Sequence, residues 1–211
     1  PGPARRRRSS FWHDRFDLPP TTRLVIHSGS LGEWTGIDQI VTAAADWPAD
    51  WALVVHTRYE AESSAYVDRL RQAADPRRVY FSLRPVPRQD YDALIDGADV
   101  GLAFYVSSGE SAFTQTNVQT IGLSSGKLAY YLRAGLPVIV NRDASIAALV
   151  ESSGCGVAVT DASAIGPALT ALAAGYDDAS DAACRFFEDH LDFSRAFASV
   201  IERVAALRGV A

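Results

Sequence analysis

Short apolar runs alternate with longer amphipathic segments along most of the chain. The apolar runs are continuous and rich in valine, isoleucine and leucine, which is typical of strands buried on both faces; they cover residues 24–27, 52–56, 79–82, 100–104, 137–140 and 156–160. Apolar positions with helical spacing occupy residues 36–45, 60–74, 89–96, 125–134, 145–152, 162–173, 178–190 and 194–207. This alternation predicts the α/β class, as a three-layer Rossmann-like domain with about six parallel strands and right-handed crossovers.

The first 22 residues depart from this pattern. They contain Pro-Gly-Pro, an arginine run at 5–8, an amphipathic stretch at 11–16 and the pair Pro19-Pro20. We interpret residues 1–22 as an interdomain linker remnant with solvated arginines, and residues 23–211 as the Rossmann-like domain. Because the chain contains no methionine, even at position 1, we expect a fragment with another domain upstream. The last segment, 194–207, is expected to pack across the domain body.

Charge and cysteine content exclude several classes of function. The formal net charge is −5, and without the four arginines at 5–8 it is −9, because 16 basic residues then face 25 acidic ones. This acidic balance argues against a nucleic-acid partner. No apolar run approaches the roughly 18 residues of a membrane span. Cys155 and Cys184 have no partner at metal-ligand spacing, so we expect free thiols, no structural zinc and a reducing, cytoplasmic location.

A doubly wound sheet binds ligands outside the carboxyl ends of its strands, where the strand order reverses. With the Rossmann order, the first and fourth strands flank that crevice. The segment after the first strand contains Gly29, Gly32 and Gly36, which let a ligand approach the backbone closely. The fourth strand is followed by a long polar connection, in which residues 107–117 are expected to be mobile without ligand.

Lys127 is the only lysine among the 20 basic residues of the chain. It follows Ser124, Ser125 and Gly126 at the expected N-terminus of a helix. Free N–H groups at a helix N-terminus and an adjacent ammonium group together favour phosphate. Because this helix follows the connection after the fourth strand, we predict that Lys127 lies at the ligand crevice. The alternative is a surface lysine that survives by chance in an arginine-biased composition.

Known phosphate-binding and catalytic motifs do not fit the sequence. The glycines of residues 29–36 do not have G-x-G-x-x-G spacing, and a P-loop fails because Ile121 stands at its first glycine and Leu128 at its Ser/Thr position. His27 and His56 end the first two strands, where we favour a hydrogen-bonded structural histidine over a catalytic one. Arg84 follows the third strand as a candidate phosphate ligand or, alternatively, a rim charge.

The order of these segments resembles a known family. Residues 23–31, 35–38, 98–102 and 124–139 together resemble the C-terminal half of GT-B glycosyltransferases, closest to the retaining bacterial group of polysaccharide and glycan assembly. The resemblance runs from about residue 23 to about residue 207. It implies that residues 23–211 bind a nucleotide-diphospho-sugar donor, and that a glycan or lipid-linked acceptor binds through a missing N-terminal domain. It implies no cofactor and no metal ion.

The resemblance also assigns parts of the binding site. The glycine loop approaches the diphosphate, residues 83–86 hold the edge of the base mainly through their backbone, and residues 124–127 meet phosphate. The residues implied in substrate binding are Gly29, Ser30, Leu31, Gly32, Arg84, Val86, Ser124, Ser125, Gly126, Lys127 and Tyr130.

Four positions depart from the family pattern. Ser30 and Thr35 stand where the family often has arginine and lysine, and Gly122 and Tyr130 stand where it commonly has two glutamates. No catalytic residue is therefore assigned; we expect Lys127 to replace the lost positive charge and Tyr130 to contact the nucleoside. The first interpretation is a glycosyltransferase donor domain that is inactive alone and is cytoplasmic, or peripheral at the inner membrane face through the missing domain. The alternatives are a catalytically inactive nucleotide-sugar-binding partner and a less favoured GT-B-fold epimerase.

Overall fold

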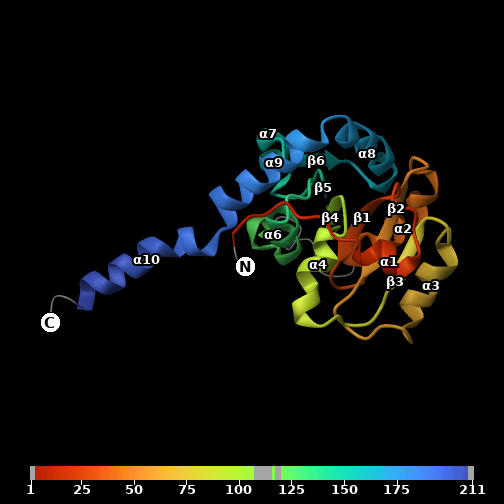
Figure 1. Ribbon diagram of the computed structural model, residues 1–211, viewed down its shortest axis with the longest axis horizontal. Coiled ribbons are helices and arrows are strands. Elements are labelled where there is room, and N and C mark those ends of the chain that lie inside the picture. Colours follow the sequence, from red (N-terminus) through yellow and green to blue (C-terminus); the bar gives the residue numbers. More distant parts are fainter. Residues whose placement is uncertain (1–2, 107–115, 117–119, 209–211) are drawn as a thin grey trace.

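Six strands form one parallel sheet in the order β3-β2-β1-β4-β5-β6 (Figure 1). The computed structural model describes residues 3–106, 116 and 120–208, so the expectation of mobility at 107–117 falls outside the described residues except at 116. The strands are β1 (Arg23–Ser28), β2 (Trp51–His56), β3 (Val79–Ser82), β4 (Val100–Ala103), β5 (Val138–Asn141) and β6 (Gly156–Val159). Val25 of β1 pairs with Leu53 of β2 and with Val100 of β4. The predicted Rossmann-like class and strand order are confirmed.

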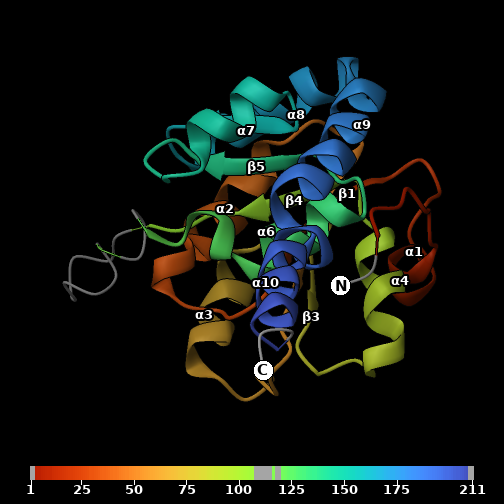
Figure 2. The ribbon, with the colours of Figure 1, turned by 90° about the vertical axis from the view of Figure 1, so that its left-hand side faces the viewer.

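Alternation along the strands divides the core into two clusters, one on each face of the sheet. Leu24 and Ile26 of β1 pack with α1, α4, α6, α7 and α9, whereas Val25 packs with α2, α3 and α8. Helices on both faces of the sheet give three layers, and Figure 2, in which β5 runs across the view, shows α10 in front of the sheet. The helices are α1 (Phe11–Phe16), α2 (Ile37–Ala43), α3 (Ala65–Ala73), α4 (Tyr91–Asp96), α6 (Gly126–Arg133), α7 (Ala147–Ser153), α8 (Ile165–Ala174), α9 (Tyr176–Phe186) and α10 (Phe193–Arg208).

The N-terminal segment packs against the sheet domain. Trp12 of α1 is fully buried, and its indole Nε1 donates a hydrogen bond of 2.8 Å to the carbonyl of Leu94 in α4. Arg5, Arg6 and Arg8 form ion pairs with aspartates of α4, of α9 and of the turn before β4. Arg6 and Arg8 stay exposed, as expected for solvated arginines, but together with Arg5 they are also held against the domain by these ion pairs. That residues 1–22 connect to another domain stays a prediction.

The C-terminal helix α10 extends away from the body of the domain (Figure 1). A π-helical turn (Phe187–Leu191) follows α9, and the extended backbone of Asp192 then redirects the chain. The expectation that this helix packs across the body is wrong, because the chain turns outward at Asp192. Its apolar stripe is exposed at Phe193, Phe197, Val200, Ile201, Val204 and Leu207. In the described part of the chain, no helix combines the length and the hydropathy needed to cross a membrane.

Candidate functional site

The carboxyl ends of β1 and β4 lie side by side at the point where the strand order reverses. The glycine loop at residues 29–32 follows β1, and residues 104–106 follow β4. The N-terminus of α6 reaches the same edge, since the Cε atom of Lys127 lies 4.0 Å from the place where a Cβ atom at Gly29 would stand. The predicted switch-point crevice is therefore where the structure brings Gly29 and Lys127 together.

Tyr131 fixes α6 against the end of β1. The backbone N–H of Ser28 donates a hydrogen bond of 2.7 Å to the hydroxyl of Tyr131. A Cβ atom at Gly101 of β4 would lie 2.3 Å from the Tyr131 ring, so this ring fits against the sheet only because residue 101 is a glycine. The position of the helix N-terminus at the crevice thus depends on one tyrosine and one glycine.

Ser125 caps α6 and prepares its first turn for an anion. The Ser125 Oγ atom accepts a hydrogen bond of 3.3 Å from the N–H of Leu128 and lies 2.6 Å from the hydroxyl of Tyr105. The first N–H groups of any α-helix have no intrahelical acceptor, and this leaves the N–H groups of Gly126 and Lys127 for a ligand. These groups carry the positive end of the helix dipole.

The Lys127 side chain is partly buried, and its ammonium lies against a carbonyl group and an aromatic ring. Its Nζ atom is 3.5 Å from the carbonyl oxygen of Phe104 and 4.4 Å from the centre of the Tyr105 ring. In the part of the chain that the structure describes, Lys127 makes no ion pair with a carboxylate, unlike Arg5, Arg6 and Arg8. Burial lowers the pKa of Lys127 from 10.5 to about 7. A cation held without a counter-ion is suited to an anionic ligand, which would restore the charged form.

The two strand-end histidines are buried and uncharged. Burial and the neighbouring Lys127 lower the pKa of His27 to about 3, and burial lowers the pKa of His56 to about 4. The Nε2 atom of His27 lies 3.2 Å from the carbonyl of Ser30, which orders the glycine loop, and the Nδ1 atom of His56 lies 3.1 Å from the Ser82 hydroxyl. Both therefore have the hydrogen-bonded structural role that their positions predict.

A group of tyrosines lines the α4 side of the crevice. The hydroxyl of Tyr91 lies 3.1 Å from the Ser28 Oγ atom, and the Tyr91 ring packs edge-on against Tyr130 with centroids 4.9 Å apart. Tyr130 is partly exposed, and the guanidinium of Arg133 lies 5.6 Å from its ring centre. Tyr130 of α6 therefore packs against Tyr91, whose hydroxyl lies beside Ser28 at the end of β1.

The structure separates the other predicted residues into two groups. Ser30 lies in the crevice through its contact with His27, and Gly32 lies under the ring of Trp34. Leu31 packs partly against the core, and the exposed Ser124 hydroxyl bonds to the carbonyl of Ile121. Among the described residues, no hydrogen bond or ion pair connects Arg84 or Val86 to this group: the Arg84 guanidinium pairs with Glu62 at 2.7 Å, and Val86 packs partly against the core. Their role in binding stays a prediction.

Sequence reasoning missed the tyrosines that organise the crevice. Tyr91, Tyr105 and Tyr131 come from α4, from the segment after β4 and from α6. The sequence offered one signal for them: tyrosines occur close to the segments predicted to bind substrate, as Tyr131 does next to Tyr130. That their hydroxyls converge on Ser28 and Ser125 depends on tertiary packing.

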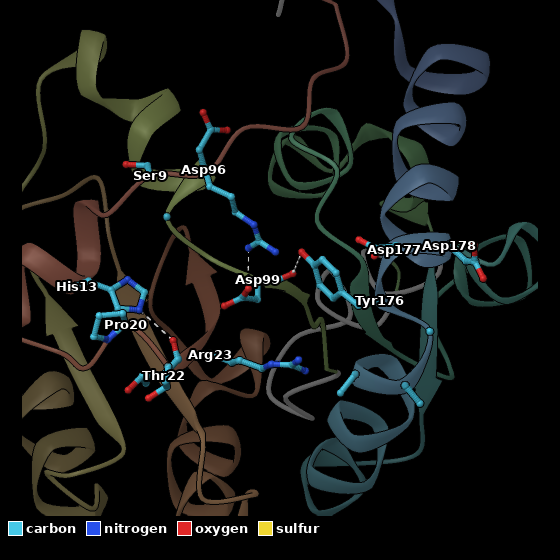
Figure 3. Close-up of a pocket in the computed structure, with 16 residues that line it drawn as sticks. Ser9, His13, Pro20, Thr22, Arg23, Asp96, Asp99, Tyr176, Asp177 and Asp178 are labelled. Atoms are coloured by element: carbon cyan, nitrogen blue, oxygen red, sulfur yellow. Dashed lines mark hydrogen bonds and ion pairs between the residues drawn. The ribbon is translucent and has the colours of Figure 1, made fainter.

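Two sizeable cavities lie elsewhere in the described part of the chain. One of about 790 Å³ opens at the amino ends of β1 and β4, where Asp99 and Tyr176 lie side by side and His13 contacts Thr22 (Figure 3). A second, of about 700 Å³, lies between α2, α3 and α8. The two arginines of the first cavity already have partners, since Arg8 contacts Asp99 at 2.6 Å and the Arg23 guanidinium lies 5.4 Å from the centre of the Trp51 ring. The crevice at the carboxyl edge remains the better candidate for an anionic ligand.

Comparisons with known proteins agree with this fold. Residues 87–188 match the family model of the glucosyltransferase 3-like C-terminal domain. This segment includes α4, β4, α6 and β5, and therefore Tyr91 and Lys127. None of the curated proteins compared with the chain matches it.

Several solved structures share the fold. Sucrose-phosphate synthase from Thermosynechococcus elongatus is 15% identical with a TM-score of 0.69, over 98% of this chain and 50% of that chain. Anabaena HepE in complex with UDP-glucose is 15% identical with a TM-score of 0.70, over 93% and 52%. The C-terminal domain of a group 1 glycosyl transferase (LpcC) from Francisella tularensis is 13% identical with a TM-score of 0.61, over 86% and 89%. The chain spans about half the length of the first two. In fold, and by the family match over residues 87–188, it is similar to the C-terminal domains of glycosyltransferases.

Proposed function

We propose that the chain is the donor-binding domain of a retaining bacterial glycosyltransferase, which binds a nucleotide-diphospho-sugar for transfer of the sugar to a glycan or similar acceptor. The observation that carries the proposal is the Lys127 ammonium at the N-terminus of α6, beside the glycine loop of β1, with no carboxylate partner among the described residues. The family match over residues 87–188 supports it, as does a structural neighbour whose crystals contain UDP-glucose.

The geometry supplies what a diphosphate leaving group requires. Negative charge develops on the phosphate oxygens as the bond to the sugar breaks, and fixed donors with an ammonium group stabilise that charge. Lys127 contributes the ammonium, and Gly126 and Lys127 contribute backbone N–H groups. Gly29 leaves space for the diphosphate beside the lysine side chain. These protein donors are the reason to propose catalysis without a metal ion.

A second candidate function is a nucleotide-sugar-binding module without transferase activity. The observation that favours it is the lack of two glutamates that the resemblance implies, because their positions hold Gly122 and Tyr130 in this chain. Gly122 carries no side chain, and its φ of +36° suits glycine. The two candidates share the binding step and differ in the transfer step.

Thermal unfolding in the presence of UDP, GDP, TDP and ADP sugars tests the binding step. A ligand at 100 times its Kd should stabilise the chain by about 2.7 kcal/mol. We expect one nucleotide family to stabilise the chain and the others to have little effect. Absence of stabilisation by all four families would contradict both candidates.

The transfer step requires the full cleft. We expect the chain to bind its donor without transferring sugar, because half of a two-domain cleft cannot position an acceptor. Turnover should appear when the complete protein is assayed with the donor that the screen identifies. Binding without turnover by the complete protein would favour the inactive module.

A further inference from the structure

Trp34 differs from the other tryptophans in the chain. Its side chain is 44% exposed, whereas Trp12, Trp47 and Trp51 are 0%, 4% and 2% exposed. It lies on the short 3-10 turn Glu33–Thr35, directly after the glycine loop of β1. Burial of a tryptophan side chain removes a large apolar area from water, so an indole left exposed beside a ligand crevice has no role in the core.

The backbone holds the Trp34 indole in one position. A Cβ atom at Gly32 would lie 2.1 Å from the indole ring, so the ring lies on a residue that has no side chain. Both the N–H and the hydroxyl of Thr35 donate to the carbonyl of Gly32, at 2.9 and 2.7 Å. The turn therefore presents the indole in a preorganised orientation, which reduces the entropy lost when a ligand packs on it.

Trp34 and Lys127 are attached to the same short segment after β4. The Lys127 ammonium contacts the carbonyl of Phe104, and the N–H of Val106 donates a hydrogen bond of 2.9 Å to the carbonyl of Trp34. A Cβ atom at Gly36, two residues after Trp34, would lie 3.3 Å from Val106. Tyr91 and Tyr130 line the other, α4 side of the crevice. The segment of residues 104–106 thus contacts both Lys127 and the Trp34 turn, while Tyr91 and Tyr130 lie on the α4 side.

We propose that Trp34 is a specificity-determining platform for the sugar ring of the donor, a proposal that rests on the proposed function. A donor whose diphosphate contacts Lys127 has its nucleoside on one side and its pyranose ring on the other. With the nucleoside toward Tyr91 and Tyr130, the pyranose extends toward the Trp34 turn. The apolar C–H face of a pyranose packs on an indole face and removes apolar area from water.

The affinity difference between a nucleotide and its sugar conjugate isolates this contact. UDP and UDP-glucose are titrated by calorimetry into the wild type and into Trp34→Ala, Trp34→Phe and Tyr59→Ala. If another base is preferred, its diphosphate and sugar conjugate replace them. Trp34→Ala should weaken the sugar conjugate about three- to tenfold and change the affinity for the diphosphate by less than about twofold. Trp34→Phe should retain most of the difference. Tyr59→Ala is the matched control, because Tyr59 is an aromatic residue with 51% exposure that follows β2 on the same edge.

The outcomes separate the proposal from the proposed function. Equal loss for both ligands in Trp34→Ala would overturn the platform and indicate a role in the diphosphate loop. An unchanged affinity for the sugar conjugate would also overturn it. If the wild type binds the diphosphate and its sugar conjugate with equal affinity, the proposed role of Trp34 is wrong, whereas nucleotide binding by the chain is supported. If no nucleotide or nucleotide sugar binds, the proposed function itself fails. Acrylamide quenching gives a second measurement, since the sugar conjugate should protect the exposed Trp34 fluorescence and the diphosphate alone should not.

Discussion

The two edges of the sheet use positive charge in opposite ways. At the amino edge, Arg5, Arg6 and Arg8 each pair with aspartates of the helices and turns they touch. At the carboxyl edge, the Lys127 ammonium faces a carbonyl and an aromatic ring, and it has no acidic partner among the described residues. The pKa of Lys127 is lowered, whereas the pKa values of Arg6 and Arg8 are raised.

This difference distinguishes cations that are paired within the fold from a cation that can form an ion pair with a bound ligand. A paired arginine has already gained its favourable interaction within the fold. An enclosed lysine without a counter-ion lost hydration on folding and recovers interaction energy only when an anion binds. Functional sites are commonly the places where such destabilised charges persist. The following predictions test whether the two edges are as distinct as the contacts indicate.

The largest expected effect concerns α1 of the N-terminal segment, which carries the arginine run. Trp12→Ala should lower the free energy of unfolding by about 3–5 kcal/mol, because it leaves a cavity between α1, α4 and the sheet and removes the hydrogen bond to Leu94. Urea unfolding measures this loss. Trp12→Phe, which keeps an aromatic ring, should be milder. Below the unfolding midpoint, nucleotide-sugar affinity should stay at the wild-type value; a large loss of affinity in the folded variant would show that the two edges are coupled.

The next largest effect concerns Lys127 itself. Lys127→Ala should weaken diphosphate binding about tenfold or more, since a charge-assisted hydrogen bond contributes roughly 1.5–3 kcal/mol. Lys127→Arg should also bind more weakly, because a planar guanidinium does not replace a compact ammonium in an enclosed position. Arg71→Ala is the control, as Arg71 lies exposed on α3 and pairs only weakly with Asp68 at 3.4 Å. Identical titration curves for Lys127→Ala and Arg71→Ala would assign the lysine no role in phosphate binding.

The lowered pKa of Lys127 predicts a pH dependence of binding. With a pKa of about 7, the free protein carries the ammonium in most molecules at pH 6 and in roughly a tenth of them at pH 8. A nucleotide sugar keeps its full negative charge over this range, so its affinity should fall about tenfold between these pH values as the lysine loses its proton. In Lys127→Arg the dependence should vanish, because arginine stays protonated. A flat pH profile in the wild type would contradict the unpaired, enclosed cation.

The smallest expected effect returns to the amino edge. Arg6 pairs with Asp177 at 2.8 Å and with Asp181 at 2.7 Å, and all three side chains are well exposed. Arg6→Ala should change the free energy of unfolding by less than about 1 kcal/mol, because solvent and salt screen such pairs. Thermal unfolding at low and high ionic strength measures this. A fall in nucleotide affinity in this variant would show that the arginine run acts beyond the edge where it lies.

The sequence predicted the architecture well because the relevant signals are local. Valine-rich runs predicted all six strands of the sheet, and helical spacing predicted the approximate positions of the helices. Both patterns can be recognised from residues that are close together in the sequence. The single lysine after a small-residue loop was also expected at the carboxyl edge of the sheet, and Lys127 lies there beside Gly29. For Arg84 the sequence named a candidate ligand, and the structure shows its guanidinium engaged with Glu62 on an exposed surface.

The sequence by itself determined the class of the fold, the order of its elements and the edge at which Lys127 stands, because each depends on neighbouring residues along the chain. Only the tertiary structure decided how charges and rings meet. The partners of Arg6, 171 and 175 residues away, the hydroxyl of Tyr131 on Ser28, and the outward course of α10 all arise from contacts between distant segments. Burial of Lys127 and its lowered pKa belong to the same group, since desolvation is a property of the packed surroundings and not of the residue.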